Sequence, residues 1–388
     1  MSNLLKSTGV ALPAAEISQH LATRSRWSAG EIAFWLVALA SIFLLPNKHL
    51  ILAEIAILGL FALSLDLILG YAGIVSLGHA AFFGLGAYVA ALLAKHQIVT
   101  EPVLALAVAG LASTILGFLT SFLVLRGTDL TRLMVTLGVA LLLREVANQM
   151  SWLTGGTDGL QGVTIEPVLG LFRFDLYGRT GYVYSLLVLF ILFVIARRIV
   201  HSPFGLSLRS IRSNPLRAAA IGIPVNRRLI VIYTVAAGYA GIAGGLLAQT
   251  TAFASMEGFS FERSADVLLV LIIGGIGNLY GGLIGAIVFK FMQDWLAVFT
   301  PQYWHFWIGL VLVMMVLFGR IYGLLIAALM FATVLALGLS FFECIAFTLL
   351  IGIVRNPILE AINRAERRLM RVVHKMPLPG RLRPRREA

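Results

Sequence analysis

Long stretches without charge dominate this chain and limit what it can fold into. Residues 102–125, for example, form 24 consecutive positions with no charged side chain, and a helix that spans a bilayer needs about 20 mainly apolar residues. Of the 388 residues, 59% are hydrophobic and 12% are charged, whereas soluble domains carry about 25% charged residues. The composition excludes an ordinary soluble, disordered or disulfide-stapled protein. It predicts the all-α class, as a polytopic integral membrane helical bundle.

Charges, prolines and glycine clusters divide the apolar sequence into separate helices. In residues 274–282, five of nine positions are glycine. Because glycine does not favour an undisturbed helix, we expect the element at 264–299 to be broken there. Residues 321–354 fit either a hairpin of two short helices or one tilted span. We expect nine to eleven membrane elements, some discontinuous, including 27–45, 50–70, 79–94, 102–125, 133–150, 181–196, 229–250, 264–299 and 304–318.

Two arginine-rich segments predict the orientation of the chain. Residues 197–228 contain seven Arg and no acidic residue, and residues 355–388 contain nine Arg and one Lys against three Glu. Positively charged loops stay on the cytoplasmic side. We therefore predict a polar cytoplasmic segment (1–26), a transmembrane domain (27–354) with a cytoplasmic loop (197–228), and a basic cytoplasmic tail (355–388). We expect a multi-pass protein of the inner membrane. Six crossings precede the loop, and because this number is even, the N-terminus should lie on the same, cytoplasmic side.

The two ends of the chain carry little further information. Residues 1–26 lack an apolar core followed by a small-residue cleavage site, so we expect direct insertion without a cleaved signal peptide. In a soluble protein, a net charge of +12 would suggest binding to nucleic acid. Here a basic helix on anionic membrane lipid is the favoured interpretation of the tail, and we expect no nucleic-acid partner.

Sequence signatures of catalysis are lacking. There is no phosphate-binding GxxxxGK[ST] loop, no His pair in an HExxH arrangement and no GxSxG nucleophile motif. The one cysteine, Cys344, lies in an apolar run and can form no intramolecular disulfide. We expect no catalytic residue, no metal site and no cofactor, and transport is favoured over an enzyme.

Residues 70–88 form the first candidate site. Glycines in membrane helices often serve close packing, which is an equally good explanation of this glycine-rich run. However, Tyr71, Ser76 and His79 place polar groups at membrane depth, and an interrupted helix exposes backbone groups that can line a substrate path. The candidate path residues here are Tyr71, Ser76, His79, Phe82 and Tyr88.

The second candidate site combines Arg144 with Asn148. These residues are four positions apart and share a helix face, and Glu145 follows Arg144. Charges within a span are costly unless they are paired or face water, so a structural ion pair and a substrate contact are both open. Thr154 belongs to the polar turn that follows, on the predicted outer side.

The third candidate site is the cytoplasmic loop around residues 202–224. Two short helices are predicted, 205–213 and 215–221, bounded by Pro203, Pro215 and the run Gly222-Ile223-Pro224. Leu208 and Ile211 lie near one face, and Arg212 lies beside them. The loop could lie on lipid head groups or dock into a partner protein.

Together these segments resemble the LivM-type permeases of branched-chain amino acid ABC importers. The glycine-rich run 70–88, the turn 154–160, the loop 202–224, the break 274–282 and the helix 303–319 occur in this order in that family. The resemblance implies a second, LivH-type permease, two ABC ATPase subunits and a periplasmic substrate-binding protein as partners. It also implies that the loop couples to the ATPases through Phe204, Gly205, Arg209, Arg212, Arg217, Ala218, Ala219 and Gly222.

One departure from the general importer pattern concerns this coupling loop. The pattern has Glu-Ala-Ala followed by Gly, whereas this chain has Arg217-Ala218-Ala219 followed by Gly222, so a contact through Glu is not expected. The alternative function is an ion-coupled secondary transporter of small polar solutes. It would use Asp66, Glu145 or Asp266 as proton or sodium sites.

Overall fold

The computed structural model describes residues 27–127, 129–175, 177–299 and 301–318. The predicted N-terminal segment (1–26), the apolar stretch 321–354 and the basic tail (355–388) lie outside the described residues. The chain divides into two compact units, residues 1–292 and 293–388. The first contains all the helices discussed below apart from α14 and the end of α13.

The predicted all-α class is confirmed. The described residues contain no β-strand, only two isolated bridges, one of which joins Leu160 to Ala254. The helices are α2 (Ala29–Leu44), α3 (His49–Asp66), η1 (Leu67–Tyr71), α4 (Ala80–Lys95), α5 (Pro102–Val124), α6 (Asp129–Gln149), α7 (Ser151–Thr154), η2 (Gly156–Asp158), α8 (Arg179–Val200), α9 (Pro203–Ser213), α10 (Pro215–Ala220), α11 (Val225–Thr251), η3 (Met256–Phe259), α12 (Phe261–Gly274), α13 (Leu279–Phe299) and α14 (Trp304–Phe318).

Five of these helical segments are long and apolar enough to cross a membrane: His49–Tyr71, Pro102–Val124, Arg179–Val200, Val225–Thr251 and Leu279–Val298. Three shorter apolar helices lie at 29–44, 80–95 and 306–315. This pattern agrees with a polytopic bundle. The total of nine to eleven membrane elements stays a prediction, because residues 321–354 lie outside the part of the chain that the structure describes.

Two helix breaks occur where the glycines predicted them. The first separates η1, which ends at Tyr71, from α4, and the second separates α12 from α13. Gly275 and Gly277 in the second break have φ angles of +103° and +83°, a conformation that other residues rarely adopt. Both breaks belong to the unit formed by residues 1–292.

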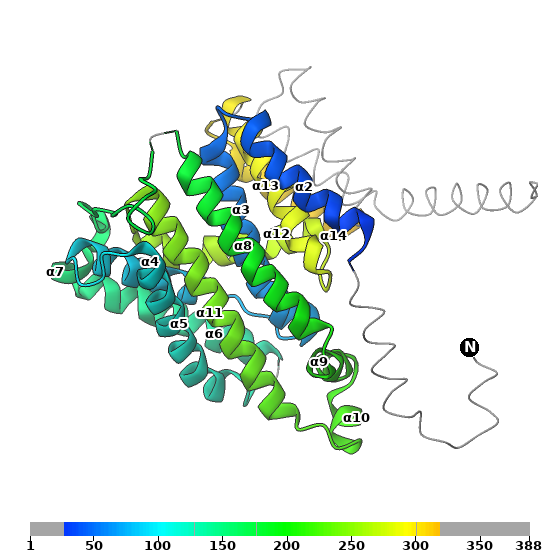
Figure 1. Cartoon of the computed structure of the whole chain (residues 1–388). Helices are drawn as coiled ribbons and strands as arrows, with labels where there is room; N and C mark the ends of the chain where they lie inside the picture. Colours follow the sequence, from blue (N-terminus) through cyan, green and yellow to red (C-terminus); the bar gives the residue numbers. More distant parts are fainter. Residues whose placement is uncertain (1–26, 128, 176, 300, 319–388) are drawn as a thin grey trace, which may run out of the picture. The chain divides into compact units, whose positions relative to one another are not determined.

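The core of this unit is built around α11, which packs against α5, α4 and α3 (Figure 1). Small residues let these helices approach closely. A Cβ atom on Gly86 of α4 would lie 2.0 Å from the carbonyl oxygen of Gly241 in α11, and one on Gly244 would lie 1.8 Å from that of Phe83. These glycines are therefore explained by helix packing.

Candidate functional site

The predicted coupling loop folds into two separately capped helices, α9 and α10. Ser202 Oγ accepts a hydrogen bond from the backbone N–H of Gly205 at 3.4 Å, and Asn214 Oδ1 accepts one from that of Arg217 at 2.9 Å. Helix α9 begins at Pro203, two residues earlier than predicted, because proline fits the first helical position next to a serine cap. Figure 1 shows both helices near the ends of α8 and α11.

One face of α9 anchors the loop to the bundle. Leu208 and Ile211 are buried, and α9 contacts η1, α8 and α11. Gly205 lies so close to the end of α8 that a Cβ atom would sit 2.2 Å from the carbonyl oxygen of Val200. Phe204 is half-buried, with the Arg228 guanidinium 5.1 Å above its ring.

Helix α10, by contrast, exposes most of its surface. Leu216 is 83% exposed and Ile221, the residue that caps the end of α10, is 70% exposed, whereas Ala218 is buried at 2%. Arg217 and Ala219 are exposed as well. These apolar side chains lie outside the candidate spans and beside arginines, and exposed apolar patches mark sites of protein or membrane interaction.

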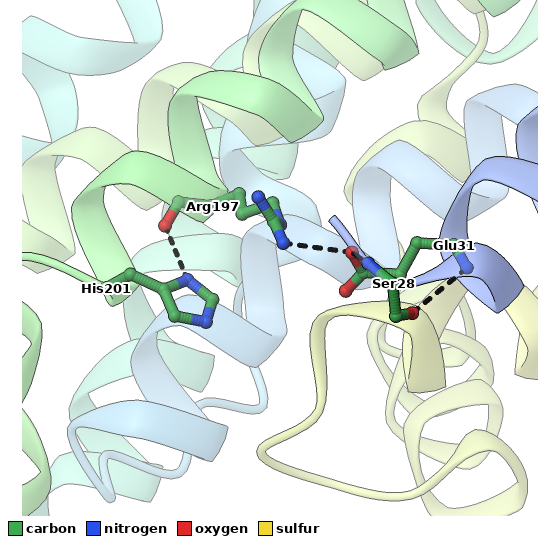
Figure 2. Close-up of polar contacts among 4 residues, drawn as sticks. All are labelled: Ser28, Glu31, Arg197 and His201. Atoms are coloured by element: carbon green, nitrogen blue, oxygen red, sulfur yellow. Dashed lines mark hydrogen bonds and ion pairs between the residues drawn. The ribbon is translucent and has the colours of Figure 1, made fainter. Parts of the chain in front are cut away.

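An ion pair that sequence reasoning missed ties the end of α8 to α2 (Figure 2). Arg197 Nη2 lies 2.9 Å from Glu31 Oε2, and their side chains are 8% and 23% exposed. The Arg197 guanidinium also lies 4.6 Å from the centre of the Trp27 ring, and His201 bonds the carbonyl oxygen of Arg197 at 2.8 Å. The partners are 166 positions apart in sequence. This contact fixes α2 against the helix that leads into α9.

The predicted path residues of the 70–88 segment are buried within the chain, with exposures between 0% for His79 and 4% for Tyr88. His79 Nε2 shares a hydrogen bond of 2.8 Å with Ser64 Oγ, and its ring stacks on Phe61 with centroids 5.7 Å apart. The Tyr71 ring lies 5.3 Å below the Arg209 guanidinium. Ser76 and Phe82 are also buried. The structure thus places these side chains inside the bundle, where they pack against neighbouring helices.

A groove with both apolar and charged lining residues runs along the exposed face of α6. Its volume is about 820 Å³. Arg144 and Asn148 line it, as predicted for residues that share a helix face, and Glu145 lies beside them. Opposite α6, the 3₁₀ helices η2 and η3 contribute Thr157, Met256 and Glu257; the other lining residues are Gly138, Leu141 and Leu142.

Thr154, the remaining predicted path residue, lies apart from the lining of the groove. It is 6% exposed, and its hydroxyl donates to the carbonyl oxygen of Ala147 at 2.6 Å and accepts from the N–H of Gly156 at 3.2 Å. These bonds fix the turn after α6. Within the described part of the chain, no group of three His, Cys, Asp or Glu side chains could hold a metal ion.

Comparisons with known proteins identify the family of the chain. Residues 49–317 match the family described as the permease component of branched-chain amino acid transport systems. The chain is 28% identical to the high-affinity branched-chain amino acid transport system permease protein LivM of Escherichia coli, over 74% of this chain and 72% of LivM.

Two further relatives extend the comparison. The chain is 27% identical to a probable branched-chain amino acid transport permease protein, LivH, of Methanocaldococcus jannaschii, over 60% of this chain and 74% of LivH. A shorter segment, which makes up 32% of the chain, matches the ribose import permease protein RbsC of Bacillus subtilis. The identity over that segment is 32%. No solved structure matches the chain. These relatives are permease components of transport systems, which favours that function over an ion-coupled secondary transporter.

Proposed function

Because the chain belongs to the family of branched-chain amino acid transport permease components, we propose that it is the transmembrane subunit of an ATP-binding cassette importer. It carries branched-chain or related amino acids across the inner membrane. Its partners are a second, LivH-type permease, two ABC ATPase subunits that hydrolyse ATP, and a periplasmic binding protein that delivers the substrate. The chain itself is no enzyme.

The α9–α10 pair carries this proposal. The buried side chains Leu208 and Ile211 hold α9 to the bundle, while α10 leaves Leu216 and Ile221 exposed. A partner that binds α10 can thus displace α9, and with it the helices that α9 contacts. Such a loop, which its arginines predict to lie on the cytoplasmic side, would supply the mechanical connection that a permease driven by a separate ATPase requires.

The α6 groove supports an amino acid as the substrate. A free amino acid carries a carboxylate and an ammonium group, and the groove offers an arginine together with two carboxylates, Glu145 and Glu257. Arg144 and Asn148 would receive the carboxylate, because guanidinium and amide donors suit it. We propose that the groove is the outer part of the translocation path, completed by the second permease.

The buried residues between Tyr71 and Tyr88 have a different proposed role. They surround the first helix break, so they would border the path only when that break moves during transport. Thr154 would hold the turn beside the groove. These assignments extend the predicted path from the exposed face of α6 to the interior of the bundle.

Uptake by the reconstituted complex tests the proposal. The chain is co-purified with its second permease and ATPase subunits, placed in liposomes with ATP enclosed, and supplied with the binding protein and radiolabelled leucine. We expect accumulation that requires ATP and persists when a protonophore or sodium removal abolishes ion gradients. Uptake that continues without ATP and collapses with the gradient would refute the proposal.

A further inference from the structure

Asp66, at the end of α3, is a buried carboxylate that the proposed function does not yet use. The residue is 0% exposed. Its Oδ1 accepts a hydrogen bond of 2.7 Å from the backbone N–H of Gly277, which lies 211 positions away in the second helix break. Its Oδ2 has no hydrogen-bond partner among the described residues. A buried carboxylate is costly unless its charge is compensated, so a nearby positive charge is expected.

Arg212, at the end of α9, is a positive charge beside the same glycine: a Cβ atom on Gly277 would lie 2.8 Å from Arg212 Nη1. Its Nη1 donates a hydrogen bond to the carbonyl oxygen of Gly70 in η1, and its positive charge acts on the Asp66 carboxyl group. The side chain passes Gly73, where a Cβ atom would lie 3.1 Å from Arg212 Cγ. Although Arg212 as a residue is exposed, its guanidinium reaches the backbone of η1, and its aliphatic part packs against the break that follows.

Glycines make this contact possible on both sides. A Cβ atom on Gly277 would lie 2.8 Å from Arg212 Nη1, and one on Gly70 would lie 2.1 Å from Asp66 Oδ1. Any larger residue at either position would displace the charged group or the backbone that it bonds. Gly70 at the end of η1 and Gly277 in the second break thus leave the space that the side chains of Asp66 and Arg212 occupy.

The contacts of Asp66 and Arg212 connect three parts of the chain: α9 and the segments at the two helix breaks. Asp66 joins the end of α3 to the break between α12 and α13. Arg212 joins α9 to η1 through Gly70, and it packs against Gly73 in the break that follows η1. Beside them, the Arg209 guanidinium covers Tyr71, the last residue of η1. Both helix breaks are therefore attached to the helix that the ATPases are proposed to displace.

We infer that Asp66 and Arg212 are positioning residues that transmit the displacement of α9 to both helix breaks, and so couple ATP hydrolysis to the opening of the path. This inference rests on the proposed function. The pair touches neither substrate nor nucleotide. Its loss should leave ATP hydrolysis running in the partner subunits while less substrate moves for each ATP consumed.

The number of ATP molecules hydrolysed per leucine taken up, measured in proteoliposomes of the complete complex, tests this role. Asp66→Ala and Arg212→Ala remove the contacts, whereas Asp66→Asn retains an oxygen acceptor and Arg212→Lys retains the positive charge. We expect the alanine variants to raise the number of ATP molecules hydrolysed per leucine about tenfold, the factor that corresponds to about 1.4 kcal/mol. The conservative variants should have ratios between those of the alanine variants and the wild type. Arg126→Ala, which removes an exposed arginine after α5, serves as the matched control with an unchanged ratio.

The outcomes separate this inference from the proposed function. If the wild-type complex shows no ATP-dependent uptake, the proposed function fails. If the wild type is coupled and the Asp66 and Arg212 variants keep its ratio, the inference is overturned and the proposed function stands. Where an alanine variant does not assemble, as judged by gel filtration and thermal unfolding, the conservative variants decide: an unchanged ratio in both overturns the inference.

Discussion

Removal of the exposed apolar side chains of α10 should weaken the binding of the ATPase subunits. Leu→Ala and Ile→Ala each remove about three CH₂ equivalents, worth about 0.8 kcal/mol apiece when buried. Leu216 is 83% exposed and Ile221 is 70% exposed, so docking can bury most of each side chain. Scaled by these exposed fractions, Leu216→Ala should cost about 2 kcal/mol and Ile221→Ala about 1.7 kcal/mol of binding free energy.

The double variant should therefore bind the ATPase subunits several hundred-fold more weakly, because about 1.4 kcal/mol corresponds to a factor of ten. The assay is a titration of the purified chain in nanodiscs with labelled ATPase subunit, followed by fluorescence anisotropy. Leu171→Ala is the matched control. Leu171 is 78% exposed, but it lies in the loop 151–181, which contains Thr154 and is predicted to lie on the outer side. Equal affinities for the wild type and the double variant would refute the docking role of α10, as would an equal loss in the control.

Three further predictions concern packing, anchoring and the groove. Gly86→Val should abolish the yield of monodisperse protein in gel filtration, because its side chain would enter the backbone of α11, whereas Gly138→Ala should be tolerated since no atom lies within 4 Å of its Cβ position. Arg197→Ala should lower the melting temperature in detergent, because it leaves Glu31 without its ion-pair partner at a cost of about 1.5–3 kcal/mol; an unchanged melting temperature would show that the pair adds no stability. Arg144→Gln should raise KM for leucine uptake at constant ATPase activity, and an unchanged KM would remove Arg144 from the path.

Local features of the fold were predictable because local chemistry determines them. Pro203 and Pro215 mark the starts of α9 and α10, since proline is suited to the first helical turn. The glycines of the second break mark the separation of α12 from α13. The shared face of Arg144 and Asn148 follows from helical spacing alone, and both residues line the same groove.

Contacts between distant segments could not be predicted in this way. The sequence shows His79 as a polar group at membrane depth, but only the packed bundle shows that Ser64 bonds it and Phe61 stacks on it. Similarly, the pairing of Asp66 with the N–H of Gly277 depends on how α3 meets α12. No pattern of charge or hydrophobicity specifies which backbone group a buried carboxylate will meet.

Accessibility of α10 tests most directly the central claim, that this loop faces the cytoplasm and binds an ATPase there. Leu216→Cys in a Cys344→Ser background provides a single thiol on the exposed face of α10, and Leu171→Cys provides one on the predicted outer side. We expect a membrane-impermeant maleimide to label the Leu216→Cys protein only in inside-out vesicles, with protection when the ATPase subunits are bound. Labelling of that protein from outside intact cells would contradict both the orientation and the proposed source of energy.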